Sequence, residues 1–306
     1  MKISIHFLAV LLLLSFVTDT QKPNVTNQKP FSIAILGDMP YIRNDSQQMV
    51  IYPQYLRVLN SINAQPVRYT VHLGDMTAQG FCTDSIFTDR AKSFELLKHP
   101  IVTLFGDNDW TDCPDPMQSL EMMRKKMLVY PKTWPTNNLK RQQEFPENVS
   151  WHDGVISFMG LHVVGSDNNF KNQPEFLKRN EATIAWMNQV FTEAKQRKSK
   201  GVVIFMQANP GPRSTTFIGR NEAGFKKLLE ELVNFAVGYN GQIALVHGDT
   251  HYFRTDMPFA IKGKVIQNIV RAESFGDPNH HWLKMNIHPD SKRLFTFEPM
   301  LIPENQ

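Results

Sequence analysis

Aspartate residues follow short apolar runs at four places in the chain. The segments are FSIAILGDMPY, YTVHLGDMTAQG, VTLFGDNDW and IALVHGDTHYF, and each has the pattern of a buried strand with an acidic end. In an open α/β sheet, ligands collect beyond the carboxyl ends of the strands. Carboxylates that converge there repel one another unless a cation neutralises them. We therefore expect a site for divalent metal ions, formed by Asp38, Asp75, Asp107 and Asp249.

Other polar residues at predicted strand ends enlarge this set of candidates. Oxygen donors outnumber ring nitrogens among them, so the ligand chemistry favours Mg, Mn, Ca or Fe over Zn. Asn108 and Asp109 also lie where a proton donor or a substrate ligand could act. The additional candidates are Asn108, Asp109, Gln207, His247 and His251.

Most of these residues also have an ordinary structural interpretation. Asp38 or Asp75 could cap a following helix, because Asp is common at a helix N-terminus. Asp109 could simply be a turn residue, and Gln207 could hydrogen-bond a neighbouring loop. The sequence leaves the role of Tyr41 open. His72 and Trp110 are interpreted as packing residues.

Alternating strand and helix patterns must position these residues. Strands separated by helices indicate right-handed βαβ units and a parallel sheet. Residues 131–146 are predicted to form a long surface loop. Two short strands after this loop are expected to form a hairpin around Gly160. The expected strands are Phe31–Leu36, Val67–Leu73, Ile101–Phe105, Val155–Met159, Leu161–Val164, Val202–Phe205 and Ile243–Val246. The expected helices are Gln48–Ile62, Ser85–Lys98, Met117–Leu128, Pro174–Lys198 and Glu222–Val237.

The C-terminal part alternates like antiparallel strands. A chain that begins α/β and ends rich in strands predicts two sheets packed face to face with helices outside. The hydrophobic content of 42% and charged content of 20% are ordinary for a globular chain. The net charge of +4 is mild and indicates no nucleic acid partner.

The first residues predict export from the cytoplasm. Met1 and Lys2 precede an apolar run from Ile3 to Val17, which is typical of a signal peptide over residues 1–20. An uncleaved signal anchor is the alternative interpretation. The remaining residues, 21–306, are expected to form a single domain, secreted and without a membrane partner. Three acceptor patterns predict N-glycosylation at Asn24, Asn44 and Asn148.

The chain has two cysteines, Cys82 and Cys113. Each follows shortly after a predicted strand end, so both would lie on neighbouring loops. In a secreted protein such a pair favours a disulfide over two reactive thiols.

The order of the acidic blocks resembles that of the calcineurin-like metallophosphoesterases. The pattern of that family runs strand-GD, strand-GD-x4-G, strand-GN-H-[DE], strand-H and strand-GH-x-H. Its five places are occupied here, over essentially the whole mature length, by LGDMP, LGDMTAQG, FGDND, VVIFMQANP and VHGDTH. The resemblance implies an α/β two-sheet sandwich flanked by helices on both sides, with a binuclear metal centre at the strand ends.

The chain departs from this pattern at most of the family's histidines. Pro40 stands where the first block has a histidine, and Asn108 stands where the third block has one. Apart from Pro40, the replacements keep oxygen atoms that can bind a hard metal or hydrogen-bond a phosphate. The pattern therefore favours a metal site with altered ligands over a site that has lost metal binding. The other replacements are Asp107 for Asn, Gln207 for His and Asp249 for His, while His251 is kept.

The resemblance implies metal-assisted hydrolysis of phosphoric esters with two divalent ions. Asp75 would bridge both ions, and Asp38 and His251 would complete the first. The ligands of the second ion would be Asp107, Gln207 and Asp249.

Asn108 occupies the place of the family's catalytic histidine, so protonation of the leaving group would fall to Asp109, His247 or water. The sequence thus predicts a secreted hydrolase of small phosphomonoesters or phosphodiesters, as a monomer or weak dimer. Two alternatives stay open. One is a weak or inactive metal- or ligand-binding protein on the same fold, and the other is a secreted nuclease or nucleotide hydrolase.

Overall fold

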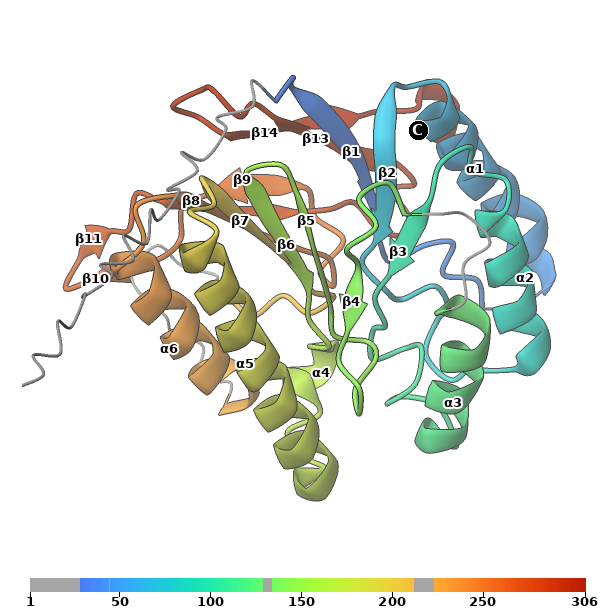
Figure 1. Cartoon of the computed structure of the whole chain (residues 1–306). Helices are drawn as coiled ribbons and strands as arrows, with labels where there is room; N and C mark the ends of the chain where they lie inside the picture. The colour runs from blue at the N-terminus through green and yellow to red at the C-terminus, as the bar shows by residue number, and fades with distance from the viewer. Residues whose placement is uncertain (1–27, 44, 129–133, 212–222) are drawn as a thin grey trace, which may run out of the picture.

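A computed structural model of the chain describes residues 28–43, 45–128, 134–211 and 223–306. Two mixed β-sheets pack face to face, with helices on both outer sides (Figure 1). The predicted fold class is confirmed. The proposed signal peptide lies outside the described residues.

The smaller sheet has the strand order β14-β13-β1-β2-β3. Strands β1, β2 and β3 run parallel, whereas β13 lies antiparallel to both β1 and β14. The carboxyl ends of three strands therefore meet at one edge of this sheet. The bounds are β1 Phe31–Leu36, β2 Val67–His72, β3 Ile101–Thr103, β13 Trp282–Ile287 and β14 Phe295–Met300.

The larger sheet has the strand order β4-β5-β6-β7-β8-β12-β9. Strands β6, β7, β8 and β12 run parallel, so that their carboxyl ends also point one way. Strands β10 (Ala260–Ile261) and β11 (Lys264–Val265) form a separate small ribbon. The remaining bounds are β4 Lys140–Arg141, β5 Val149–Asp153, β6 Ile156–Gly160, β7 Gly201–Phe205, β8 Gln242–His247, β9 Arg254–Asp256 and β12 Ile269–Glu273.

The hydrophobic core between the two sheets comes from side chains on their facing surfaces. Trp151 and Phe158 of the larger sheet stack with ring centroids 5.2 Å apart, within the same cluster as Ile33 and Val71 of the smaller sheet. Burial of such apolar surface is the main force that holds the layers together.

The helices cover the two outer faces. On the smaller sheet, α1 (Asp45–Asn63), α2 (Asp84–Phe94) and α3 (Pro116–Met127) pack in a cluster that includes Tyr55 and Phe87. On the larger sheet, α5 (Gln173–Gln196) and α6 (Ala223–Val237) lie side by side (Figure 1). A one-turn element α4 (Gly165–Asn168) precedes α5, and a 3-10 turn η1 (Pro303–Asn305) ends the chain.

The expected hairpin around Gly160 is wrong. Strand β6 ends at Gly160, and it pairs with β5 through a two-residue turn at Gly154 and Val155. Gly154 has a φ of +57°, which glycine adopts without steric cost. Residues 161–164 leave the sheet instead of forming a second strand.

Within the described ranges, no helix is both long and apolar enough to cross a membrane.

Candidate active site

The four strand-end aspartates leave β1, β2, β3 and β8 at the edge where the parallel strands end. The helix-cap interpretation does not hold for the first two. Helix α1 begins only at Asp45, and helix α2 is capped by Thr83, whose hydroxyl accepts a hydrogen bond from the Ile86 N–H. The carboxylates of Asp38 and Asp75 are therefore available for other contacts.

An unusual backbone conformation aims these side chains. Asp38, Asp75, Asp249 and His251 have φ values of 52°, 53°, 82° and 57°, in the left-handed region that residues other than glycine rarely adopt. Such residues cost on the order of 1 kcal/mol or more each and cluster at functional sites. Glycine allows the close approach they require, since a Cβ atom on Gly106 would lie 1.9 Å from Asp75 Oδ1.

Asn108 links Asp75 to Tyr41. Its side-chain Nδ2 donates to Asp75 Oδ2 at 2.8 Å and to Tyr41 Oη at 2.7 Å. Its backbone N–H also donates to Asp75 Oδ1 at 3.2 Å. Asn108 thus fixes the orientation of the Asp75 carboxylate from one side.

Asp109 is fully buried and holds two loops together. Its carboxylate accepts hydrogen bonds from the backbone N–H groups of Asp75, Met76 and Gly106, at 2.8, 2.8 and 2.9 Å. Burial raises the pKa of Asp109 to about 7, although these hydrogen bonds oppose the shift. The contacts favour a positioning role over proton donation to a substrate.

Asp107 and Gln207 meet the turn that follows β6. Ser166 Oγ donates to Asp107 Oδ2 at 2.9 Å, and the Gly165 N–H donates to Gln207 Oε1 at 2.7 Å. Asp107 Oδ1 and Gln207 Nε2 are buried without a hydrogen-bond partner among the described residues. The loop-bonding alternative for Gln207 therefore holds for its oxygen, while its nitrogen is unsatisfied.

Asp38 connects to the loop after β8. Both of its carboxylate oxygens accept the Asp249 N–H at 3.1 Å, and His251 Nε2 lies 3.5 Å from Asp38 Oδ1. His251 Nδ1 contacts the carbonyl oxygen of Asp277 at 2.6 Å. Burial lowers the pKa of His251, but the Asp38 carboxylate outweighs it and raises the pKa to about 9.

The acidic side chains disfavour one another's ionisation. Burial, followed by the charges of Asp107 and Asp38, holds the pKa of Asp75 well above its usual range. Burial and the charge of Asp107 raise the pKa of Asp249 to about 7. Burial also raises the pKa of Asp107 to about 6. These mutual effects show that the four strand ends converge.

His247 lies at the end of β8 and is fully buried. Its Nδ1 contacts the Gly248 carbonyl at 2.9 Å, and its Nε2 has no hydrogen-bond partner among the described residues. Burial lowers the pKa of His247 to about 3, so that the ring is neutral. A neutral imidazole keeps one N–H but is too weak an acid to protonate a leaving group at neutral pH, and its full burial favours a packing role.

The donor set suits a hard cation. Within the described ranges, no three acidic, histidine or cysteine side chains form a group spaced to hold a metal ion. An ionised carboxylate offers about four lone pairs, however, so Asp75 keeps acceptor capacity beyond its two bonds from Asn108. The unpartnered Asp107 Oδ1 and the raised pKa values are what a bound divalent ion would relieve. The residues present therefore fit the metal in ligand chemistry.

The predicted disulfide between Cys82 and Cys113 is present, with Cα atoms 5.8 Å apart. It ties the loop after β2 to the loop after β3. Each sulfur lies 3.6 Å from the Asn108 carbonyl oxygen, so the bridge packs directly behind that residue. Trp110 is buried beside it, as expected of a packing residue.

Asn148 is a poor acceptor for a glycan. It is fully buried, and its Nδ2 donates to Gln142 Oε1 at 2.7 Å and Thr183 Oγ1 at 3.1 Å. A glycan there would break these bonds and displace the packing, so the structure speaks against this prediction. Asn24 and Asn44 lie outside the described residues.

Sequence reasoning missed two residues of this region and left a third open. Ser166 contacts Asp107 from a turn with no recognised motif. Glu273, fully buried in β12, accepts the Thr250 N–H at 3.1 Å and pairs with Arg254 at 2.5 Å, which fixes the loop carrying Asp249. Tyr41, whose role was open, lies at the site. The sequence features that could have indicated Ser166 and Glu273 are the GSDNN segment, residues 165–169, and the acidic residue at the end of β12.

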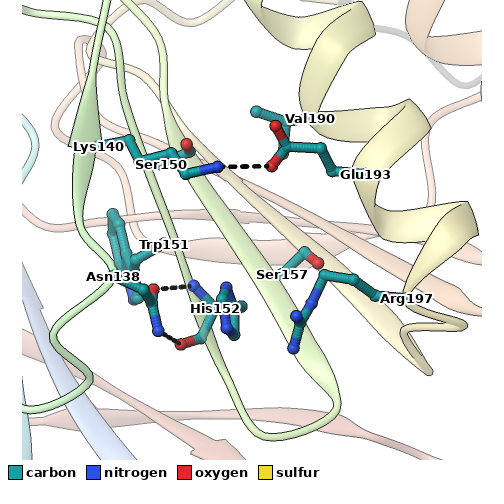
Figure 2. Close-up of a pocket in the computed structure, with 9 residues that line it drawn as sticks. All are labelled: Asn138, Lys140, Ser150, Trp151, His152, Ser157, Val190, Glu193 and Arg197. Carbon is teal, nitrogen blue, oxygen red and sulfur yellow. Dashed lines mark hydrogen bonds and ion pairs between the residues drawn. The ribbon is translucent and has the colours of Figure 1, made fainter.

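A separate small pocket contains none of these residues. Figure 2 shows it between β5 and the last turns of α5, with Lys140 paired to Glu193 at 3.5 Å and Asn138 bonded to the backbone of His152. Its volume of about 20 Å³ accommodates no more than a water molecule. This pocket therefore has no room for a phosphate ester.

No protein-family model matches the sequence, and the search of curated proteins found no match. Solved structures do match. A dimetal phosphatase from Danio rerio has a TM-score of 0.58 at 10% identity, covering 88% of this chain and 96% of its own. GAP50, titled the anchor in the inner membrane complex of Plasmodium, has a TM-score of 0.51 at 11% identity, covering 90% of each chain.

A 5'-nucleotidase from Candida albicans has a TM-score of 0.50 at 12% identity, with 90% of this chain and 52% of that chain covered. The present chain thus spans about half of the nucleotidase. Together these matches confirm, at the level of the fold, the resemblance to the metallophosphoesterases.

Proposed function

We propose that this protein, which has the metallophosphoesterase fold, is a metal-dependent hydrolase of phosphate esters. One observation supports the proposal above others. Four aspartates from four separate strands converge, and each of Asp75, Asp107 and Asp249 has a pKa raised by burial among the others. Such an arrangement is costly without a cation and is typical of a functional site.

The ligands would come from both sheets. A bound divalent ion would polarise a phosphoryl oxygen and lower the pKa of a coordinated water. The donor oxygens favour Mg, Mn, Ca or Fe. In this proposal the ligands of two ions are Asp38, Asp75, Asp107, Gln207, Asp249 and His251.

The surrounding residues hold these ligands in place. Asn108 orients Asp75, while Asp109 fixes the backbone that carries both. Ser166 orients Asp107 through one oxygen, and the other oxygen has no hydrogen-bond partner in the part of the chain that the structure describes. Ligands held by their neighbours in this way need little reorganisation when an ion and a phosphate ester bind.

Replacement of Asp75 tests the proposal. We expect Asp75→Asn to lower hydrolysis of p-nitrophenyl phosphate by on the order of 10²-fold or more, since metal-assisted catalysis supplies several kcal/mol. Activity of the unaltered protein should be lost in EDTA and return with Mg or Mn. The matched control is Asp290→Asn, an exposed carboxylate in the turn between β13 and β14.

Folding of each variant is checked by thermal unfolding. If the unaltered protein hydrolyses no ester in a broad phosphate panel with Mg, Mn, Fe, Co or Zn, the proposal is wrong.

A non-catalytic binding protein is the second candidate. The contact of His251 with Asp38 supports it, because a cationic imidazole can partly neutralise the site without a metal. GAP50, which has a similar fold, is the anchor in the inner membrane complex of Plasmodium. This alternative predicts that Ca raises the melting temperature without any turnover, and that Asp75→Asn folds normally.

The substrate class and the compartment complete the proposal. A small phosphomonoester or phosphodiester is the expected substrate, and nucleotides are the alternative because a nucleotidase shares the fold. Hydrolysis of nucleotides but not of simple esters would select that alternative. We further propose a single secreted domain over residues 21–306, monomeric or weakly dimeric, with glycans at Asn24 and Asn44. Mass spectrometry of the exported protein tests cleavage after Thr20 and both glycans.

A further inference from the structure

Asn108 has no hydrogen-bond donor left for a substrate. An ionised carboxylate only accepts hydrogen bonds, so the contact with Asp75 Oδ2 places the Nδ2 nitrogen of Asn108 on that side. An amide nitrogen carries two hydrogens, and the second is donated to Tyr41 Oη at 2.7 Å. The backbone N–H is donated to Asp75 Oδ1. The residue at this place therefore cannot donate a hydrogen bond to a phosphate.

Tyr41 has the donor that Asn108 lacks. Its oxygen accepts the Asn108 hydrogen bond, and no described residue accepts the hydroxyl hydrogen in return. The side chain is half-buried, and its hydroxyl lies near the acidic residues because Asn108 donates hydrogen bonds to both Tyr41 and Asp75. A phenol is neutral and protonated at neutral pH.

Three features fix the Tyr41 ring. It meets His251 edge to face, with ring centroids 5.2 Å apart and planes at 82°. Its backbone has a φ of 54°, a conformation that persists only when the surroundings hold it. The Arg43 guanidinium also lies over the ring, 5.1 Å from its centroid. A hydroxyl held by one accepted hydrogen bond, on a ring that contacts both His251 and Arg43, is already oriented before a ligand binds.

We propose that Tyr41 is the residue that donates a hydrogen bond to a nonbridging oxygen of the bound phosphate ester. This inference rests on the proposed function. It assigns to Tyr41 the hydrogen bond to the substrate that Asn108 cannot donate. A neutral hydroxyl can stabilise phosphoryl charge without adding a second cation to the Arg43 guanidinium that already lies against the ring. Since the hydrogen bond goes to the phosphoryl group, its contribution does not depend on the leaving group.

Tyr41→Phe tests the inference, because it removes the hydroxyl and keeps the ring contact with His251. Binding of inorganic phosphate is measured by calorimetry with Mn present, and kcat and KM are measured on p-nitrophenyl phosphate and phenyl phosphate. A hydrogen bond to a charged group contributes enough that we expect a loss of about tenfold or more in phosphate affinity. We expect kcat/KM to fall by a similar factor for both esters.

The matched control is Tyr252→Phe. Tyr252 follows His251 directly and is 67% exposed, and its hydroxyl has no hydrogen-bond partner among the described residues. This variant should leave phosphate affinity and turnover unchanged. Asn108→Ala is a second test, because it removes the hydrogen bond that Asn108 donates to the Tyr41 hydroxyl. It should weaken phosphate binding, and adding Tyr41→Phe should then weaken it by less than Tyr41→Phe does alone.

The outcomes separate this inference from the proposed function. If the unaltered protein turns over and Tyr41→Phe matches it in affinity and kinetics, the role of Tyr41 is wrong and the hydrolase proposal stands. A protein without turnover whose phosphate affinity still falls in Tyr41→Phe would support the Tyr41 contact and contradict the hydrolase. An unaltered protein that binds no phosphate would overturn both. A defect confined to phenyl phosphate would overturn the nonbridging contact.

Discussion

Asp107 and Asp109 are two positions apart in the chain, yet their carboxylates have opposite environments. Asp107 has one oxygen bound to Ser166 and one buried oxygen without a partner among the described residues. Asp109 accepts three backbone N–H groups from the loops after β2 and β3. The hydrogen bonds therefore indicate that Asp107 is suited to bind a metal, whereas Asp109 stabilises the backbone of the two loops.

Asp109→Asn should destabilise the protein more than it changes the chemistry. The amide can accept through one oxygen only, so at least one buried N–H is left unsatisfied, at about 1–3 kcal/mol each. We expect a fall of about 2 kcal/mol or more in the free energy of unfolding, measured by urea denaturation. Asp112→Asn is the control, since no backbone N–H of the described residues donates to that partly buried carboxylate. An Asp109→Asn variant as stable as the control would contradict the positioning role.

At the scale of elements, two loops carry most of the site and the disulfide joins them. Cys82 follows β2 and Cys113 follows β3, and both sulfurs contact the Asn108 carbonyl. A short turn after β6 closes the site from the other sheet. Residues 166–169 of that turn all have φ values between 51° and 56°, an uncommon run for side chains other than glycine.

Replacing both cysteines with serine should lower the free energy of unfolding by about 2–4 kcal/mol, because a cross-link restricts the unfolded chain. The loop carrying Asn108 should also lose protection, seen as faster amide hydrogen exchange around residues 106–113. Exchange in α6, on the other sheet, serves as the internal control. Unchanged exchange near Asn108, with only global stability lost, would show that the bridge does not order the site.

For the whole molecule, regular patterns made the architecture predictable. Buried strands followed by Gly-Asp indicated parallel strands that end in polar residues, and their order along the chain specified the two-sheet fold. Proximity of Asp38, Asp75 and Asp107 was predictable from topology, because parallel strands deliver their carboxyl ends to one edge of a sheet. Asp249 comes from β8 of the other sheet, and it joins them because the two sheets pack face to face. His72 was interpreted as a satisfied core residue, and its two ring nitrogens are both hydrogen-bonded.

The remaining features depend on contacts that no local pattern encodes. The turn at Gly154 follows an Asp-Gly pair, a known hairpin signal, but β5 lacks clear alternation and the sequence predicts no strand there. Ser166 reaches Asp107 only because consecutive residues adopt a left-handed backbone. Tyr41 is brought to Asn108 by the exit path from β1. Its proposed role depends on both amide hydrogens of Asn108 being donated already, and this is visible only in the folded structure.

Buried histidine should make the whole molecule sensitive to acid. His72 accepts the Gly74 N–H at 3.1 Å and contacts the Met39 carbonyl at 3.0 Å, and burial lowers its pKa to about 4. Below about pH 6.5 the unfolded chain then binds a proton that the folded chain does not, so stability falls as the pH falls towards 4. For a fully buried ring this amounts to roughly 3 kcal/mol.

His72→Gln keeps one donor and one acceptor but removes the titration. We expect lower stability at pH 7.5, because the geometry is less suitable, together with a shallower decline between pH 6.5 and 4.5. Urea unfolding of both proteins across that range, in EDTA so that metal binding does not contribute, measures the slopes. Equal slopes would mean that the acid sensitivity arises from other buried groups, and that the link His72 forms between the loops after β1 and β2 is not pH-dependent.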